Sequence, residues 1–212
     1  MKLTVLGATG GTGQHVVRRA LDAGHHVTAV VRDPARLTVA ADPRLEVVVA
    51  DVFDPESIAA AVTGRDAVID TLGPRPGTEP TVCSRGAQAV VAAVAANNSA
   101  ARLLVVTGSG HARDAGDGPV TRYLLKPLVG ALALRKQFAD FGRAERAVFD
   151  SRLRWTVLRP PQLTDGGRKP YRTALDRNVR GGFRLSRADL ADAIMVALDD
   201  PKTVGHVIGL GY

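Results

Sequence analysis

Short apolar runs alternate with helix-like stretches along the whole chain. The runs are rich in Val, Leu and Ile and nearly continuous in apolar character, as strands covered on both faces of a sheet are. They cover Lys2–Leu6, His26–Val31, Leu45–Val49, Ala67–Asp70, Arg102–Val106, Trp155–Leu158 and His206–Ile208. We therefore predict about seven strands.

Segments with helical spacing or helix-forming composition lie between these runs. They cover Thr12–Ala23, Pro55–Val62, Thr81–Ala96, Arg135–Ser151 and Arg187–Leu198. Asp54 followed by Pro55 is a good helix start, because the carboxylate can cap the helix and proline suits its first position. Strands that alternate with helices are typical of βαβ units. The pattern predicts an α/β fold with a doubly wound parallel sheet.

The length of the chain, 212 residues, fits one domain over residues 1–212 with a small C-terminal lobe. Two irregular polar stretches, Gly108–Pro119 and Thr164–Gly182, follow the carboxyl ends of predicted strands. Open α/β sheets bind their ligands at that edge. We therefore expect loops near residues 108–120 and 160–185 to build a substrate site.

Cysteine content and hydropathy narrow the class of protein. Cys83 is the only cysteine, which excludes a disulfide framework and indicates a reducing compartment. The sequence contains no apolar stretch of about 18 residues and no secretory apolar region. Its Asp and His residues are too scattered for a metal site. We expect a soluble, cytoplasmic protein without a metal or a membrane partner.

The excess of positive charge is local. Of the formal net charge of +7, residues 1–106 contribute nothing, and the whole excess lies in residues 107–212. Seven basic side chains fall between Arg168 and Arg187, against Asp176 alone. They form either a solvated basic surface or a rim that attracts an anionic substrate or cofactor. Nucleic acid is disfavoured, because only Tyr171 and Phe183 interleave with these charges.

The first predicted strand ends in the sequence GATGGTG, residues 7–13, and a predicted helix follows directly. This context makes a dinucleotide site possible. Gly7 would permit the tight turn, Gly10 would let the backbone approach a pyrophosphate, and Gly13 would let the helix pack against the strand. The phosphates would rest on the helix N-terminus, where free N–H groups favour negative charge. The alternative is an ordinary strand-to-helix turn.

The residues after the second strand bear on cofactor choice. An acid there binds the ribose 2′-hydroxyl of NAD, whereas a cation accommodates the 2′-phosphate of NADP. Arg32 takes this position, and Arg36 lies one turn later. The guanidinium favours NADP over NAD. Asp33 leaves the alternative open, because a shift of one residue in the strand boundary would place a carboxylate there.

Two further segments follow strand ends. Asp51-Val52 comes after the third strand, and Leu72-Gly73-Pro74-Arg75 comes after the fourth. Each segment could border the adenine or the ribose of a bound nucleotide, and each could be a simple turn.

The motifs GATGGTG, VVRDPAR, ADV, TLGPR, VVTGSG, WTVLRPPQL and LSRADLADAI occur in this order. With them the chain resembles the atypical short-chain dehydrogenase/reductases, a Rossmann-fold NAD(P)H-binding family, near the biliverdin IXβ reductase/flavin reductase group and the NmrA-like proteins. The resemblance implies an active-site wall of Thr107, Gly108 and Ser109 and a nicotinamide-side loop of Pro160 and Pro161. It further implies cofactor contacts from Gly7, Thr9, Gly10, Thr12, Gly13, Arg32, Arg36, Asp51, Val52, Leu72, Gly73, Arg75, Thr107 and Pro160.

The chain departs from the larger dehydrogenase family at its catalytic dyad. Those enzymes carry Tyr-x-x-x-Lys on one helix, whereas here Tyr123 and Lys126 are three residues apart and Pro127 follows. Ser109, His111 and Tyr123 are the candidate catalytic residues, since each could donate a proton or hold a carbonyl. His111 could equally be a surface histidine.

These features lead to two hypotheses. The first is an NADPH-dependent oxidoreductase that transfers hydride to a small neutral or anionic acceptor, such as a flavin, a quinone or a tetrapyrrole. Such an acceptor needs orientation more than side-chain catalysis. The second is a non-catalytic redox sensor of the NmrA-like type. Either protein would bind small molecules rather than nucleic acid, as a monomer or a homodimer.

Arg32→Ala should weaken NADPH binding far more than NADH binding, because only NADPH carries a 2′-phosphate. A hydrogen bond to a charged group contributes roughly 1.5–3 kcal/mol, so the loss for NADPH should be about 10- to 100-fold. Calorimetric titration with both cofactors measures the two losses. Equal losses would show that Arg32 does not read the 2′-phosphate.

Overall fold

The computed structural model describes residues 1–74, 80–97, 100–112, 114, 116–117 and 134–212. All seven predicted strands are present within these ranges. They are β1 Lys2–Leu6, β2 His26–Val31, β3 Leu45–Val49, β4 Ala67–Asp70, β5 Arg102–Val106, β6 Arg154–Arg159 and β10 His206–Gly211. Three short strands were not predicted: β7 Gln162–Thr164, β8 Arg172–Leu175 and β9 Arg184–Ser186.

Within the described residues, eight strands form one sheet in the order β3-β2-β1-β4-β5-β6-β10-β8. All neighbours pair in parallel except β8, which runs antiparallel to β10 at the edge. The order reverses between β1 and β4, which is the switch point of a doubly wound sheet. The predicted Rossmann fold is confirmed.

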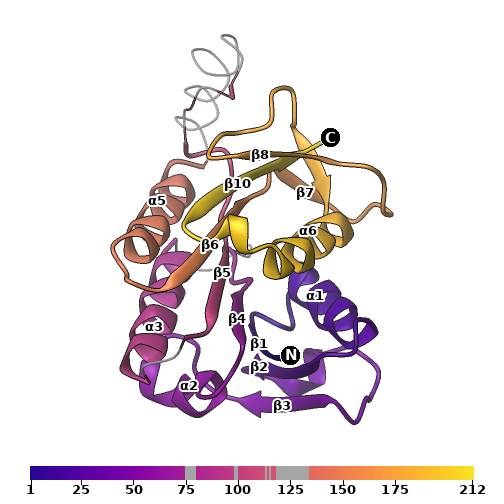
Figure 1. Ribbon diagram of the computed structural model, residues 1–212, viewed down its shortest axis with the longest axis vertical. Coiled ribbons are helices and arrows are strands. Elements are labelled where there is room, and N and C mark those ends of the chain that lie inside the picture. The colour runs from indigo at the N-terminus through magenta and orange to yellow at the C-terminus, as the bar shows by residue number, and fades with distance from the viewer. Residues whose placement is uncertain (75–79, 98–99, 113, 115, 118–133) are drawn as a thin grey trace.

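The five predicted helices cover the two faces of this sheet. They are α1 Gly11–Asp22, α2 Pro55–Val62, α3 Val82–Ala96, α5 Arg135–Phe149 and α6 Arg187–Asp199. Helices α1 and α6 lie together on one face, and α2, α3 and α5 lie on the other (Figure 1). Two short 3-10 helices, Pro34–Arg36 and Pro201–Thr203, complete the described elements.

The central strand β1 shows why both faces are covered. Alternate side chains of a strand point to opposite faces. Leu3 and Val5 are fully buried in the core beneath α1 and α6, and Leu6 is fully buried in the core beneath α2 and α3. Apolar side chains on both sides of one strand therefore require two helical layers.

The C-terminal part is more regular than the sequence indicates. The stretch Thr164–Gly182, expected to be irregular, contains the edge strand β8. Strands β7 and β9 form a separate parallel pair just before α6. Three of the four residues of β8 are exposed, so no apolar run marks it in the sequence. None of the helices in the described ranges has the length and apolar composition that a membrane crossing needs.

Helix α3 receives its N-terminal cap from another helix. Its own N-cap residue, Thr81, makes no side-chain capping hydrogen bond. Instead, the carboxylate of Asp140 on α5 accepts hydrogen bonds from the backbone N–H groups of Cys83 at 2.8 Å and Ser84 at 3.2 Å. Asp140 is buried. It therefore satisfies two helix-end donors that would otherwise be buried without partners.

Asp140→Ala should lower the free energy of unfolding by about 1–3 kcal/mol, because two buried N–H donors lose their acceptor. Chemical denaturation measures the change. Asp22→Ala is the matched control, since Asp22 is exposed in the last turn of α1 and should leave stability nearly unchanged or slightly higher. An Asp140 variant as stable as this control would mean that water satisfies the two donors.

Candidate functional site

One large cavity lies at the carboxyl edge of the sheet. Its volume is about 1140 Å³, and its walls come from the glycine loop, the segments after β2, β3, β4 and β5, helices α3 and α5, and the C-terminal lobe. A pocket for one ligand typically has about 300–1,000 Å³. The cavity is therefore larger than a usual pocket for one drug-sized ligand.

The glycine loop has the geometry of a phosphate cradle. Gly7 has a φ of +76°, a left-handed conformation, and its carbonyl accepts a hydrogen bond from Gly10 N–H at 2.8 Å. A Cβ at Gly13 would overlap the Gly7 carbonyl oxygen. Helix α1 begins at Gly11, and its N-cap Gly10 has no side chain that could occupy the first-turn N–H groups. These residues fit a pyrophosphate at the helix N-terminus.

Most of the expected cofactor contacts border the cavity. The lining includes Gly7, Thr9, Gly10, Thr12, Arg32, Val52, Leu72, Gly73, Thr107 and Pro160. Three expected contacts are not in this lining: Gly13 packs against Gly7, Arg36 lies in the first 3-10 helix, and Asp51 accepts a hydrogen bond from Phe53 N–H at 3.0 Å. Arg75 lies outside the described residues.

The boundary of β2 separates the roles of Arg32 and Asp33. The strand ends at Val31, and Arg32 directly after it lines the cavity. The carboxylate of Asp33 instead accepts a hydrogen bond from Ala35 N–H at 3.1 Å and caps the 3-10 helix Pro34–Arg36. The cation therefore borders the cavity, and the neighbouring carboxylate is used in local structure.

The cavity wall contains a cation–π pair, Arg85 with Phe53, that the sequence analysis did not predict. The Arg85 guanidinium on α3 lies 4.6 Å from the centre of the Phe53 ring, and both residues line the cavity. Phe53 follows Asp51-Val52, the segment expected beside the adenine. No sequence spacing signals this pair, because its members come from different βα units.

Part of the cavity wall is aromatic. Phe138 and Phe141 on α5 and Phe183 before β9 contribute to it, and Phe183 is 55% exposed. A Cβ at Gly108 would lie 2.9 Å from the Phe141 ring, and one at Gly110 would overlap the Phe138 ring. The loop after β5 can therefore lie flat on the two rings only because glycine occupies both positions.

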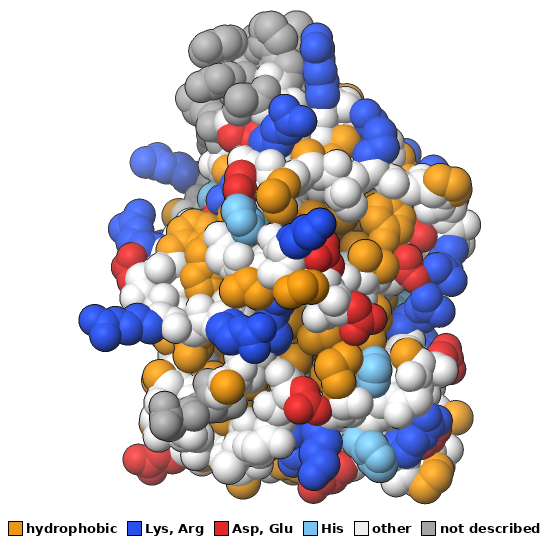
Figure 2. Space-filling model, viewed as in Figure 1, with side chains coloured by type: hydrophobic (Ala, Val, Ile, Leu, Met, Phe, Trp, Pro, Cys, Tyr) orange, Lys and Arg blue, Asp and Glu red, His pale blue; other side chains and the backbone are white. Residues whose placement is uncertain are grey.

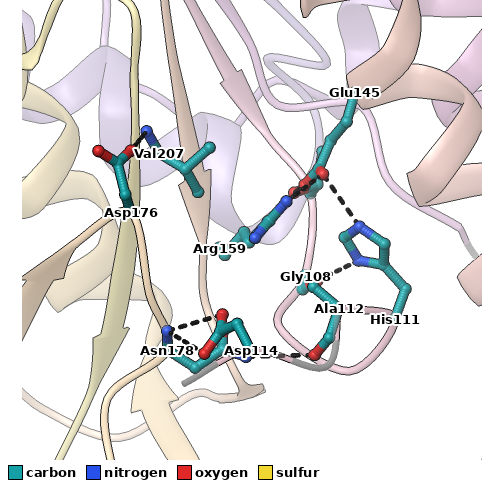
Figure 3. Close-up of polar contacts among 10 residues, drawn as sticks. Gly108, His111, Ala112, Asp114, Glu145, Arg159, Asp176, Asn178 and Val207 are labelled. Atoms are coloured by element: carbon teal, nitrogen blue, oxygen red, sulfur yellow. Dashed lines mark hydrogen bonds and ion pairs between the residues drawn. The ribbon is translucent and has the colours of Figure 1, made fainter. Parts of the chain in front are cut away.

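His111 belongs to a buried polar network behind this wall. Its Nε2 lies 3.0 Å from a carboxylate oxygen of Glu145, and its Nδ1 lies 2.7 Å from the Gly108 carbonyl (Figure 3). Arg159 donates two hydrogen bonds to the same carboxylate, at 2.8 and 2.5 Å, and the Thr107 hydroxyl donates a third at 2.7 Å. Both ring nitrogens of His111 therefore lie within hydrogen-bond distance of an oxygen atom.

The network alters the ionisation of Glu145. Burial alone raises the pKa of this carboxyl, but hydrogen bonds from Arg159 and His111 outweigh burial and lower the pKa to about 2. His111 is not among the cavity-lining residues, whereas Ser109 is. Tyr123 lies outside the described residues. Catalytic roles for Ser109, His111 and Tyr123 stay predictions.

The two expected substrate loops meet at Asn178. Its backbone N–H lies 3.0 Å from both carboxylate oxygens of Asp114, and its side-chain amide donates to the Ala112 carbonyl and to Asp117 at 3.3 Å (Figure 3). Asn178 and Asp117 both line the cavity. The described part of the loop near 108–120 is thus tied to the loop near 160–185.

The basic stretch Arg168–Arg187 is partly neutralised. Arg168 pairs with Asp192 at 2.5 Å, and Arg187 pairs with Asp165 at 2.6 Å. Figure 2 shows basic side chains spread around one face with acidic ones among them rather than a single basic block. Among the basic side chains of this stretch, that of Arg187 lines the cavity.

Comparison with known proteins agrees with this geometry. A family model described as NAD(P)H-binding matches residues 7–201. The chain belongs to this NAD(P)H-binding family. The Bacillus subtilis protein YwnB is 27% identical over 95% of this chain and 94% of its own length, and YhfK of the same organism, named a sugar epimerase, is 30% identical over 99% and 94%.

Solved structures share the fold of this family member. A short-chain dehydrogenase/reductase from Veillonella parvula, solved in complex with NADP, superposes with a TM-score of 0.82 at 21% identity and covers 100% of this chain and 94% of its own. The chain also matches part of a photosystem II assembly factor of Cyanophora paradoxa, of which it spans 25%. The family match shows NAD(P)H binding, and the glycine loop at this edge of the sheet has a geometry that fits a pyrophosphate.

The Glu145 network should make stability depend on acid pH. Because the folded-state pKa of Glu145, about 2, lies below the ordinary value of 4.5, its stabilisation is present above about pH 4.5 and is lost as the pH falls towards 2. Between pH 5 and 2, the wild type should lose roughly 3 kcal/mol more unfolding free energy than Glu145→Gln.

Denaturation at several pH values measures this difference. Glu56→Gln is the control, because Glu56 is exposed in the first turn of α2 and should retain the acid dependence of the wild type. Parallel pH profiles for wild type and Glu145→Gln would show that the carboxylate contributes no pH-dependent stability.

Proposed function

We propose that this protein is an NADPH-dependent oxidoreductase that transfers hydride to a small planar acceptor such as a flavin, a quinone or a tetrapyrrole. The observation that carries the proposal is the continuity of the cavity. It runs from the glycine cradle and Arg32 to the aromatic wall of Phe138, Phe141 and Phe183. A dinucleotide and a second ligand can therefore lie in one enclosure, as hydride transfer requires.

The preference for NADPH over NADH rests on Arg32. Its guanidinium borders the cavity at the end of β2, while Asp33 caps a 3-10 helix. A guanidinium binds a phosphate through paired charge-assisted hydrogen bonds. Its hydrogen bond to a neutral ribose hydroxyl is weaker. A protein of the same fold from Veillonella parvula was solved in complex with NADP.

The composition of the lining favours an acceptor that needs little side-chain acid catalysis. Among the described lining residues, Asp117 is the sole carboxylate, and none is a His, Lys or Tyr. The Thr107 hydroxyl donates to Glu145. The nicotinamide, when bound, supplies the hydride; the two-electron reduction of the acceptor is completed by a proton from water. The protein orients the two partners and excludes solvent between them.

The aromatic wall sets the acceptor class. Three phenylalanines and Leu163 offer flat, apolar surface, which favours a ring system over a sugar. The described lining contains no His, Lys or Tyr, and this composition also suits the second hypothesis. A redox sensor of the NmrA-like type would use the same cradle, bind both redox forms of the cofactor and catalyse nothing.

A panel of acceptors separates the two functions. NADPH absorbance is followed with FMN, dichlorophenolindophenol and biliverdin. An oxidoreductase should consume NADPH with at least one of them, whereas binding of both redox forms without turnover would favour the sensor.

Phe183→Ala tests the acceptor wall. It should raise the KM for the acceptor about tenfold, from roughly 1.5 kcal/mol of lost apolar contact, and leave the Kd for NADPH unchanged. Leu175→Ala is the control, because Leu175 is similarly exposed on β8 but does not line the cavity. If the two variants have the same KM, the acceptor does not lie on Phe183.

A further inference from the structure

Gly11 is not explained by the phosphate motif. In the sequence GATGGTG, Gly7, Gly10 and Gly13 follow the spacing of the cradle, and Gly11 falls outside it. The structure shows what occupies the space beside it. A Cβ at Gly11 would lie 2.7 Å from Cδ and 2.9 Å from Nε of Arg187. The side chain of Arg187 therefore lies against the first turn of α1.

The backbone that carries Arg187 is held firmly. Arg187 is the first residue of α6, and the Ser186 hydroxyl before it accepts a hydrogen bond from Asp189 N–H at 3.0 Å. Asp189 in turn accepts a hydrogen bond from the hydroxyl of Tyr212 at 2.6 Å. Both hydrogen bonds lie at the start of α6. They fix the point from which the long side chain reaches α1.

The Arg187 guanidinium has capacity for a second anion. Its Nη1 lies 2.6 Å from the Asp165 carboxylate, and the Asp165 side chain is 87% exposed. A guanidinium has five N–H donors, and one carboxylate engages at most a pair of them in a fork. Donors therefore remain on a side chain that lines the cavity beside Gly10, Gly11 and Thr12.

We propose that Arg187 binds the pyrophosphate of the cofactor beside the first turn of α1. This inference rests on the proposed dinucleotide binding. The helix N-terminus supplies partial positive charge, and Arg187 adds a full charge from another element of the chain. Arg32 and Arg187 then divide the work: Arg32 reads the 2′-phosphate, and Arg187 binds the group that NADP and NAD share.

Three ligands and two variants test this division by calorimetry. Arg187→Gln should weaken NADP⁺ and NAD⁺ by the same factor, about tenfold for a lost charge-assisted hydrogen bond at a partly exposed site. Adenosine 2′-monophosphate, which lacks the pyrophosphate, should bind Arg187→Gln as it binds the wild type. Arg187→Lys keeps the charge without the fork, and should fall between.

Arg184→Gln is the matched control. Arg184 is exposed on β9, three residues before Arg187, and does not line the cavity. The control changes the net charge equally and should leave all three affinities within about twofold of the wild type. Thermal melts confirm that each variant is folded, and Arg187→Lys carries the test if the Gln variant is not.

The outcomes separate a failure of the inference about Arg187 from a failure of the proposed function. If Arg187→Gln binds both dinucleotides as Arg184→Gln does, Arg187 only packs on Gly11 and the inference is wrong. A loss confined to NADP⁺ and adenosine 2′-monophosphate would place Arg187 on the 2′-phosphate and overturn it too. If the folded wild type binds no dinucleotide, the proposed function itself fails.

Discussion

The tight packing of helix α1 against the turn that follows strand β1 is the constraint on which the site depends. Gly13 lies so near the Gly7 carbonyl that no side chain fits between them. A larger residue would push the helix away and move its first-turn N–H groups with it. The neighbouring strands are held in register with β1, so the other cavity walls would not follow that shift.

A second constraint is the buried carboxylate of Glu145, which holds the loop after β5 in place. Glu145 on α5 binds Thr107 and His111 in the loop after β5 and Arg159 at the end of β6, so this helix, this loop and this strand end meet at one charge. The charge stays buried because strong donors surround it. The loop beside Phe138 and Phe141 is therefore held by buried polar contacts, although the surface that it presents to the cavity is apolar.

The sequence predicted the fold and the tight glycine turn before α1 well, because their signals are local. Apolar runs marked the central strands, and the glycine spacing marked the cradle. Strand β8 was missed since its residues are exposed at an edge. Three tertiary contacts were missed for another reason: those of Glu145, of Arg85 with Phe53, and of Arg187 with Gly11. Each contact joins residues far apart in the chain, and no pattern along the sequence predicts it.

The cap that Asp140 places on α3 links two walls of the cavity. Helix α3 carries Arg85 and helix α5 carries Phe138 and Phe141, and all three side chains line the cavity. Since one carboxylate of α5 holds the first turn of α3, fraying of either helix would loosen the other. Occupancy by one ligand would then stiffen the compartment of its partner, an entropic route to cooperative loading that needs no change of shape.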